Sequence, residues 1–308
     1  MSLYFDRRIR VSLPSAQAAS AALGVVDVSG GVALDAALKY KFSVEKRRGS
    51  KKPDSLKLEV YNLSATTFSH LAADKQRIVL QAGYSSATET SALVSELPTL
   101  FDGEIFYAKR ERSGSDIVAT VEARAVPSSF SGHVVATAAG RVSMTAVLNE
   151  TLSKIFSDPS VNVGIGQQNL GQDVVLSNGV YFDGTYTQVL NSITDILDCD
   201  QWIEDGKLHI VNRASQADTA AVLLSQSSGL IGIPAKTKID LTALRGKNRK
   251  QTDGWTVKSL LNGTIRQGRI VTVDSHFAGK FTVGAYSVVH TGETDGQDWY
   301  TEFTGIPV

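Results

Sequence analysis

Alternation of apolar and polar residues near both ends of the chain is the feature that most restricts what this sequence can fold into. Residues 38–44 (LKYKFSV) put their apolar side chains on one face and their polar ones on the other, and residues 56–63 (LKLEVYNL) repeat the pattern. Such alternation marks antiparallel strands with one buried face. We expect these two strands to form a long hairpin around the basic loop 45–54. Three later strands complete the inventory of a small barrel or sandwich, expected at 77–84, 103–110 and 116–124.

The middle of the chain follows the helical period instead. Residues 144–156 place apolar side chains along one stripe, as an amphipathic helix does. Thr185 and Gln188 fit a capping box that opens a second helix over 185–199. In the first part of the chain, Ser64 is expected to cap one short helix. Helices are therefore expected mainly between the two alternating regions.

Residues 201–211 are expected to form a hairpin, because the pair Asp205-Gly206 suits a two-residue type I′ turn. The Gly-, Asn- and Gln-rich stretch 164–172 is predicted to be a loop. The last third returns to strands separated by Gly, Asn and Asp turns, expected at 228–235, 254–261, 268–275, 280–290 and 298–305. The predicted class is mainly β with an α+β middle segment, divided into domains 1–125, 126–214 and 215–308.

Composition agrees with a folded protein. The chain has 308 residues, 31 Lys+Arg against 31 Asp+Glu, and 42% hydrophobic residues, which excludes a disordered chain. No apolar run approaches the ~18–20 residues that cross a bilayer, so we expect no membrane insertion. Arg7, Arg8 and Arg10 stand where a secretory signal would be apolar, so we expect the chain to fold in a cytoplasm.

The balanced charge hides three blocks. Residues 155–206 contain eight acids and no Lys or Arg, whereas residues 1–154 hold 19 bases and 15 acids and residues 207–308 hold 12 bases and 8 acids. An acidic middle between two mildly basic flanks is consistent with three structural units. It is equally consistent with acids that populate one solvated face.

Two short basic clusters are the candidate interface residues. Both contain glycine and small polar residues, so they are predicted to be loops that either are simply solvated or contact phosphate or an acidic partner surface. Neither cluster has the interleaved aromatic residues that stack on single-stranded nucleic acid. The first comprises Lys46, Arg47, Arg48, Lys51 and Lys52, and the second comprises Arg245, Lys247, Arg249 and Lys250.

The sequence offers no convincing catalytic or cofactor site. Cys199 is the single cysteine and is expected to be a small buried side chain, and no Cys/His cluster has zinc-ligand spacing. Asp274-Ser275-His276 combines catalytic residue types, but neighbours in a strand point to alternate faces and cannot form a triad. The Gly164/Gly166 pair lacks the context of a dinucleotide loop. We therefore predict neither an enzyme nor a bound metal or cofactor.

Four acids and three tryptophans keep two other functions open. A carboxylate pair among Asp198, Asp200, Glu204 and Asp205 is the minimal requirement for a glycosidase, although surface acids or turn residues are the simpler interpretation. The tryptophans stand beside apolar residues in separate strands, which favours packing over a sugar-binding platform. They are Trp202, Trp255 and Trp299.

The ordered set of segments resembles the baseplate hub proteins of contractile-tailed bacteriophages, which are related to the hub half of type VI secretion spike proteins. In the first domain the resemblance lies in LKLEVYNLS, DKQRIVLQAGY and the Phe101-x-Gly103-x-Ile105 strand with its charged turn and returning strand. The helix at 185–199 with QWIEDGKLHIV resembles the middle segment. His290-x-Gly292, before the Trp299 strand, resembles the last domain. The sequence departs from the family at Ala125-Val126, where an Ala-Asp-Gly corner is expected.

The resemblance implies two tail-tube-like β domains per chain and a homotrimer at the end of the tail tube. Three chains with two such domains each would offer six positions to a sixfold tube and meet a threefold spike on the other side. The implied partners are the tube or tube-initiator protein and the central spike protein, with the tape measure and baseplate wedge proteins as further candidates. The implied location is the virion tail baseplate, assembled in the host cytoplasm. Hubs of pyocins, other injection machines and long non-contractile tails fit equally.

In such a ring, the hairpin 38–63 would project its basic tip, residues 46–52, along the axis or toward a neighbouring ring. That tip, together with 245–250, would then contact an acidic partner, without sequence-specific recognition of nucleic acid. The alternatives are a tail-associated cell-wall hydrolase and a carbohydrate-binding module.

Overall fold

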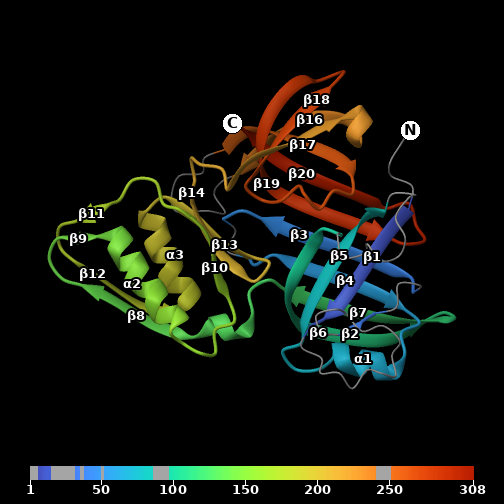
Figure 1. The fold of residues 1–308 in the computed structure, drawn as a ribbon, viewed down its shortest axis with the longest axis horizontal. Coiled ribbons are helices and arrows are strands. Elements are labelled where there is room, and N and C mark those ends of the chain that lie inside the picture. Colours follow the sequence, from blue (N-terminus) through green and yellow to red (C-terminus); the bar gives the residue numbers. More distant parts are fainter. Residues whose placement is uncertain (1–5, 15–31, 35–37, 50–51, 86–96, 241–250) are drawn as a thin grey trace.

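The computed structural model describes residues 6–14, 32–34, 38–49, 52–85, 97–240 and 251–308, and every structural statement below concerns those residues. Two β units lie side by side and a mixed unit of helices and short strands lies against their junction (Figure 1). Both β units belong to one continuous sheet of 13 strands.

The first β unit is an antiparallel sheet whose alternating side chains fill one core. Its strand order is β3-β4-β7-β6-β5-β1, and β2 adds to β1. Ser64 caps the helix by accepting from the backbone N–H of Thr67 at 3.0 Å, as the sequence predicts. The elements are β1 (Asp6–Leu13), β2 (Val32–Ala33), β3 (Tyr40–Arg47), β4 (Ser55–Tyr61), α1 (Ala65–Leu71), β5 (Arg77–Ser85), β6 (Thr99–Ser113) and β7 (Asp116–Arg124).

The last β unit has the strand order β16-β17-β20-β19-β18-β15. Its long strand β19 pairs with β20 along one edge and with β18 along the start of the other edge. The elements are β15 (Asp218–Ser225), the 3₁₀ turn η3 (Gln226–Ser228), β16 (Leu230–Asp240), β17 (Gln251–Leu260), β18 (Arg269–Ser275), β19 (Gly279–Glu293) and β20 (Trp299–Pro307).

The two β units repeat one topology. Taken in chain order, β1, β3, β4, β5, β6 and β7 match β15, β16, β17, β18, β19 and β20, and the two spatial orders are then identical. Even the irregularity repeats, because β6 has a register shift at Phe106 against β7 and β19 has one at Tyr286 against β20. One difference is that β1 pairs antiparallel with β5, whereas β15 pairs parallel with β18. The repeat of architecture expected from the sequence is therefore present strand for strand.

The middle unit packs two helices on short strands. Thr185 and Gln188 form the expected capping box, and Asp205 and Gly206 have φ of 50° and 70°, as a type I′ turn requires. The elements are η2 (Ser128–Ser131), β8 (His133–Ala138), β9 (Val142–Ser143), α2 (Met144–Phe156), β10 (Gly164–Asn169), β11 (Val175–Leu176), β12 (Val180–Thr185), α3 (Tyr186–Ile196), β13 (Cys199–Glu204) and β14 (Lys207–Asn212).

One prediction for the middle unit is wrong. The stretch 164–172, expected to be a loop, contains β10, which pairs in parallel with β14. Its side chains are mostly exposed, so the strand has no apolar face that a sequence pattern reveals. The backbone ladder with β14 holds it in place instead.

Three clusters of buried apolar side chains stabilise the chain, and they follow the three predicted regions except at two residues. Leu261 and Trp299, from the last third, belong to the core of the first β unit. Trp299 packs edge-on against Phe42, with ring centroids 5.6 Å apart. The mainly β class with an α+β middle is confirmed, while the domain boundaries 1–125, 126–214 and 215–308 stay a prediction.

Candidate functional site

The junction between the two β units is a continuous strand pair, β3 with β19. The pairing runs from Lys41 opposite Glu293 to Arg47 opposite Ser287 and uses the edge of β19 that β18 leaves after Gly284. Because β19 serves both units, the sheet continues across the junction without a free edge at this point.

The bulged residue Tyr286 closes one end of this junction. Arg48 donates its backbone N–H to the carbonyl oxygen of Tyr286 at 2.9 Å. The guanidinium of Arg47 lies 5.3 Å from the Tyr286 ring centroid. Tyr286 itself is only 4% exposed. A buried aromatic residue therefore fills the place where the two units meet.

The tip of the first hairpin enters the middle unit. Lys46 Nζ lies 2.6 Å from a carboxylate oxygen of Glu204, and Arg48 Nε lies 3.0 Å from Asp200. Arg48 also donates to the carbonyl oxygens of Asn212 and Ser215, each at 2.8 Å. Lys46 and Arg48 are 3% and 5% exposed, so these are buried ion pairs. Breaking such a pair by removing one partner leaves an uncompensated buried charge.

Two bases from the last part of the chain pair with further acids of the middle unit. Arg213 contacts Asp200 at 2.9 Å and Asp198 at 2.8 Å, and it donates to the carbonyl oxygen of Cys199. Arg266 lies 2.5 Å from Asp205. The acidic block found in the sequence is thus partly neutralised by bases from both flanks.

Asp54 is a buried carboxyl group beneath these pairs. Its oxygens accept from the backbone N–H of Arg47 at 3.1 Å and from Gln267 Nε2 at 2.8 Å. Burial raises the pKa of Asp54 to about 7, although Lys46 opposes the shift. Burial is the largest influence on Glu204 and works against its ionisation, but the charge and hydrogen bond of Lys46 together with the charge of Arg266 outweigh it, so the pKa of Glu204 is lowered. Of the two carboxyl groups, Glu204 is the one that stays charged against the lysine.

His290 is buried at the same junction on β19. Its Nδ1 lies 2.9 Å from Thr301 Oγ1. Burial lowers the pKa of His290 to about 3, so the ring is neutral at ordinary pH.

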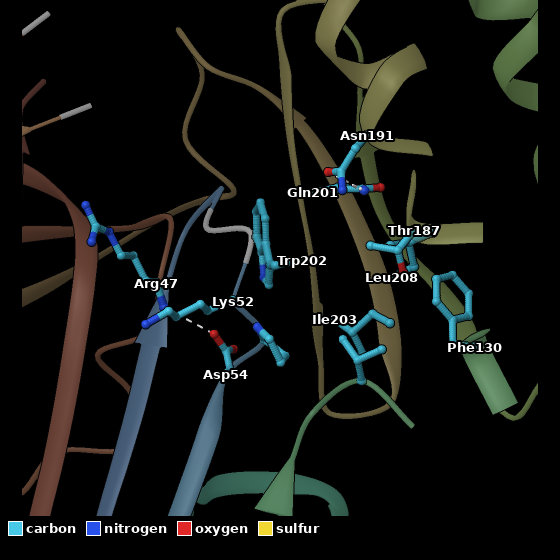
Figure 2. Close-up of a pocket in the computed structure, with 12 residues that line it drawn as sticks. Arg47, Lys52, Asp54, Phe130, Thr187, Asn191, Gln201, Trp202, Ile203 and Leu208 are labelled. Carbon is cyan, nitrogen blue, oxygen red and sulfur yellow. Dashed lines mark hydrogen bonds between the residues drawn. The ribbon is translucent and has the colours of Figure 1, made fainter. Parts of the chain in front are cut away.

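A pocket of about 230 Å³ lies between the hairpin tip and the middle unit (Figure 2). Arg47, Lys52 and Asp54 approach it from the hairpin side. The opposite wall is mostly apolar and comes from the middle unit, with Phe130, Thr187, Asn191, Gln201, Trp202, Ile203 and Leu208 labelled in the figure. The pocket has the character of a packing cavity at an interface more than of a reaction centre.

The geometry does not assemble the catalytic groups that the sequence left open. Asp198, Asp200, Glu204 and Asp205 all have basic partners, which is unlike the free carboxylate pair that glycoside hydrolysis needs. Ser275 Oγ accepts from the backbone N–H of Ala278. Within the described residues, no group of three or more His, Cys, Asp and Glu side chains has metal-binding geometry. Within the same residues, no helix is long and apolar enough to span a membrane.

The predicted interface residues fall into three groups. The expectation of an exposed basic tip is wrong for Lys46 and Arg48, which are buried against acids of their own chain. Arg47 is half-buried and Lys52 is exposed, and both line the pocket. The others lie outside the described residues, namely Lys51, Arg245, Lys247, Arg249 and Lys250.

Sequence reasoning missed Asp200 and Glu204 as partners of the basic cluster. The signal was present, because the acidic middle block lacks any Lys or Arg and its charges need partners from elsewhere. It also missed Asp54, Gln267 and His290, for which the sequence gives no local sign.

Comparison with known proteins finds solved structures that share this architecture. No family model matches the sequence, and no curated protein matches it. Among solved structures, a tail protein from Neisseria meningitidis MC58 superimposes with a TM-score of 0.60 at 8% identity, covering 98% of this chain and 97% of that one. The 43 kDa tail protein of prophage MuSo2 from Shewanella oneidensis gives 0.58 at 10% identity, covering 98% of both chains.

A third similar structure comes from a secretion machine. An Escherichia coli component of the type VI secretion system, described as structurally similar to the T4 bacteriophage tail proteins gp27 and gp5, gives a TM-score of 0.56 at 11% identity. The match covers 88% of this chain and 73% of that one. At such identities the likeness concerns the fold. The chain has the β-rich fold of these phage tail proteins.

Proposed function

We propose that this chain is a structural baseplate hub of a phage tail. Three copies would form a ring with pseudo-sixfold symmetry that adapts the sixfold tail tube to the threefold central spike. The proposal rests on one observation, the strand-for-strand repeat of two β units within a single chain. A threefold ring of such chains presents six similar units, which is what a sixfold partner requires.

The described chemistry supports a mechanical role over an enzymatic one. The acids that a hydrolase would need are engaged in ion pairs, and Trp202 and Trp299 are buried in packing contacts, whereas a sugar-binding platform needs them exposed. We propose that these buried ion pairs fix the orientation of the middle unit against the β units. In this proposal the middle unit is held rigidly against the ring by Lys46, Arg48 and their acids.

Stoichiometry tests the proposal directly. Native mass spectrometry should give a mass of three chains, and negative-stain images should show annular particles. A protein that stays monomeric at every accessible concentration would contradict the ring. Clearing of a peptidoglycan zymogram by the purified protein would favour the hydrolase instead.

The proposed partners are the tube or tube-initiator protein and the spike, with tape measure and wedge proteins as further contacts. The basic residues that face solvent or the pocket, Lys52 and Arg47, are proposed to meet an acidic surface of one of them. Reversing both charges should then block attachment to the tube while native mass spectrometry still gives the trimer. Lys57→Glu on β4 is a matched control, because this exposed lysine lies outside the cluster. Normal tail assembly with the double reversal would show that this part of the proposal is wrong.

A further inference from the structure

Among the strand edges that have no partner within the described strands, two are related by the repeat. One is the outer edge of β16, the last strand of the sheet on that side. The other is the second half of β6, from Tyr107 to Ser113. There β7 occupies one edge, while β5 pairs along the opposite edge only as far as Glu104. In Figure 1 the β6–β7 hairpin extends away from the body of the first unit.

The repeat gives both open edges a counterpart inside the chain. β16 is equivalent to β3, and the second half of β6 is equivalent to the second half of β19. Those two counterparts are paired with each other in the junction described above. The open edge of β6 in the first unit is therefore equivalent to the edge of β19 that pairs with β3. The last unit carries β16, the equivalent of β3, which is the strand that pairs with such an edge.

Four exposed large apolar side chains lie on the strands that carry these two edges. Phe106 and Tyr107 on β6 are 48% and 44% exposed, and Ile231 and Ile233 on β16 are 37% and 62% exposed. Phe106 stands at the register shift equivalent to that of Tyr286, which is buried by the junction within the chain. Large apolar side chains left exposed at unpaired edges are typical of surfaces that bind another chain.

We propose that β16 of one copy pairs antiparallel with residues 107–113 of β6 in the next copy. This inference rests on the proposed function and specifies how its ring would close. The contact is head-to-tail, since different surfaces meet, and contacts of this type generate rings when the rotation closes. Each copy would then bury both of these edges.

The junction within the chain predicts the register between copies. Glu45 lies opposite Val289 in that junction. Following the hydrogen-bonded partners across each unit makes Thr237 the equivalent of Glu45 and Lys109 the equivalent of Val289. The predicted contact therefore places Thr237 of one copy directly opposite Lys109 of the next.

This register also sets two cations opposite each other, Lys236 and Arg110. Each is already engaged within its own copy. Lys236 Nζ lies 5.6 Å from the Trp255 ring centroid, and Arg110 donates to the carbonyl oxygen of Leu63 at 3.0 Å. The pairing is therefore carried by backbone hydrogen bonds and apolar contact, with charge as a small opposing contribution.

Engineered disulfides test the register. Residues directly opposite in an antiparallel pair have Cβ atoms about 4.5–5.5 Å apart, close enough for a disulfide after a small adjustment. In the full chain, Lys109→Cys combined with Thr237→Cys should give bands of two and three covalently joined chains on non-reducing gels after oxidation. The native Cys199 does not interfere, because it is 1% exposed and burial raises its pKa to about 11.

Two matched pairs make the result specific. Glu45→Cys with Val289→Cys reproduces the same geometry within one chain and should give a crosslinked monomer. Lys109→Cys with Lys238→Cys is one residue out of register, so its side chains point to opposite faces and should stay unlinked.

The outcomes separate this inference from the proposed function. A trimer by native mass spectrometry, with the Glu45/Val289 control crosslinked but Lys109/Thr237 unlinked, would overturn the edge pairing and leave the ring intact. Covalent ladders longer than three chains would support the edge pairing and contradict the trimer. A monomer without intermolecular disulfides would overturn both.

Discussion

The two β units of this chain have the same strand order, but equivalent positions on their surfaces are buried in one unit and exposed in the other. Their equivalent core positions, such as Leu58 and Val257 or Ile78 and Val271, are buried in both. Their equivalent junction positions differ, because Lys46 is buried against Glu204 whereas Lys238 is exposed beside Asp253. The comparison teaches that the shared strand order depends on the core, while each unit's surface follows from which neighbour it meets.

The largest effect should come from Lys46→Met, compared with Lys238→Met at the equivalent position. Removing Lys46 leaves Glu204 charged and buried, which is expected to lower the free energy of unfolding by about 3–5 kcal/mol. Removing Lys238 breaks a pair whose two side chains are exposed to solvent, so the loss should be far smaller. Urea denaturation followed by tryptophan fluorescence measures both.

A second variant checks the cause of that loss. Lys46→Met combined with Glu204→Leu removes both buried charges and should recover most of the lost stability. If the double variant is as unstable as Lys46→Met alone, packing around the lysine stem is responsible and the ionic interpretation is wrong.

The next effect concerns pH and a carboxyl group that is buried only in the first unit, since Asp253 at the position equivalent to Asp54 is exposed. The pKa of Asp54 rises from an ordinary 3.8 to about 7 on folding, so the folded state holds a proton that the unfolded state has lost between those values. The contribution of Asp54 therefore favours folding less as pH rises from 4 to 7, by up to about 4 kcal/mol. Asp54→Asn should remove this decrease, and its stability should exceed that of the native chain at pH 8.

His290 acts in the opposite direction over part of this range. Its pKa falls to about 3 on folding, so its contribution to stability increases as pH rises from 3 to 6.5. Thermal unfolding of Asp54→Asn, of His290→Gln and of the native chain from pH 4 to 8 separates the two. A native-like fall in stability above pH 6.5 in Asp54→Asn would contradict the assignment to Asp54.

The two bulge residues provide a third comparison. Tyr286→Ala removes a buried ring and should lower the free energy of unfolding by about 3 kcal/mol. Phe106→Ala, at the equivalent exposed position, should change the stability of the isolated chain little and weaken assembly instead. Denaturation and sedimentation velocity distinguish the two effects. Equal loss of stability in both variants would contradict the equivalence drawn from the register shifts.

The smallest effect should come from charge at the predicted contact between copies. Lys236→Glu replaces the repulsion from Arg110 of the next copy by attraction, worth roughly 0.2–1 kcal/mol for each contact. Mass photometry on dilution should then show assemblies that persist to lower concentration. Lys57→Glu, on an exposed strand position away from both edges, is the control and should leave the dissociation concentration unchanged. Weaker assembly in Lys236→Glu would contradict the register.

Local chemistry explains which elements the sequence predicts well. The caps at Ser64 and Thr185 and the Asp205-Gly206 turn depend on neighbours within four residues, so their structure follows from short segments. The strand β10 at 164–169 was hidden because its stability comes from a backbone ladder with β14, more than 40 residues away in the chain. A pattern of side chains cannot report a ladder of that kind.

The junction was harder to predict than the units it joins. Alternation in β3 and β19 indicates two strands, but nothing in either segment indicates that they pair across some 240 residues. Lys46 and Arg48 have the composition of a solvated loop, and only the distant acids Glu204 and Asp200 make their burial tolerable. The complementary charge blocks were the sole sign of this arrangement.

Strand β19 has a mechanical consequence. Because one 15-residue strand is hydrogen-bonded to β18, β20 and β3, force applied along it is shared by parallel rungs that must all shear together. A flexible linker would let the two β units rotate relative to each other, whereas a strand that pairs with both units couples their motion. The pair should respond to thrust along the strand as one stiff plate.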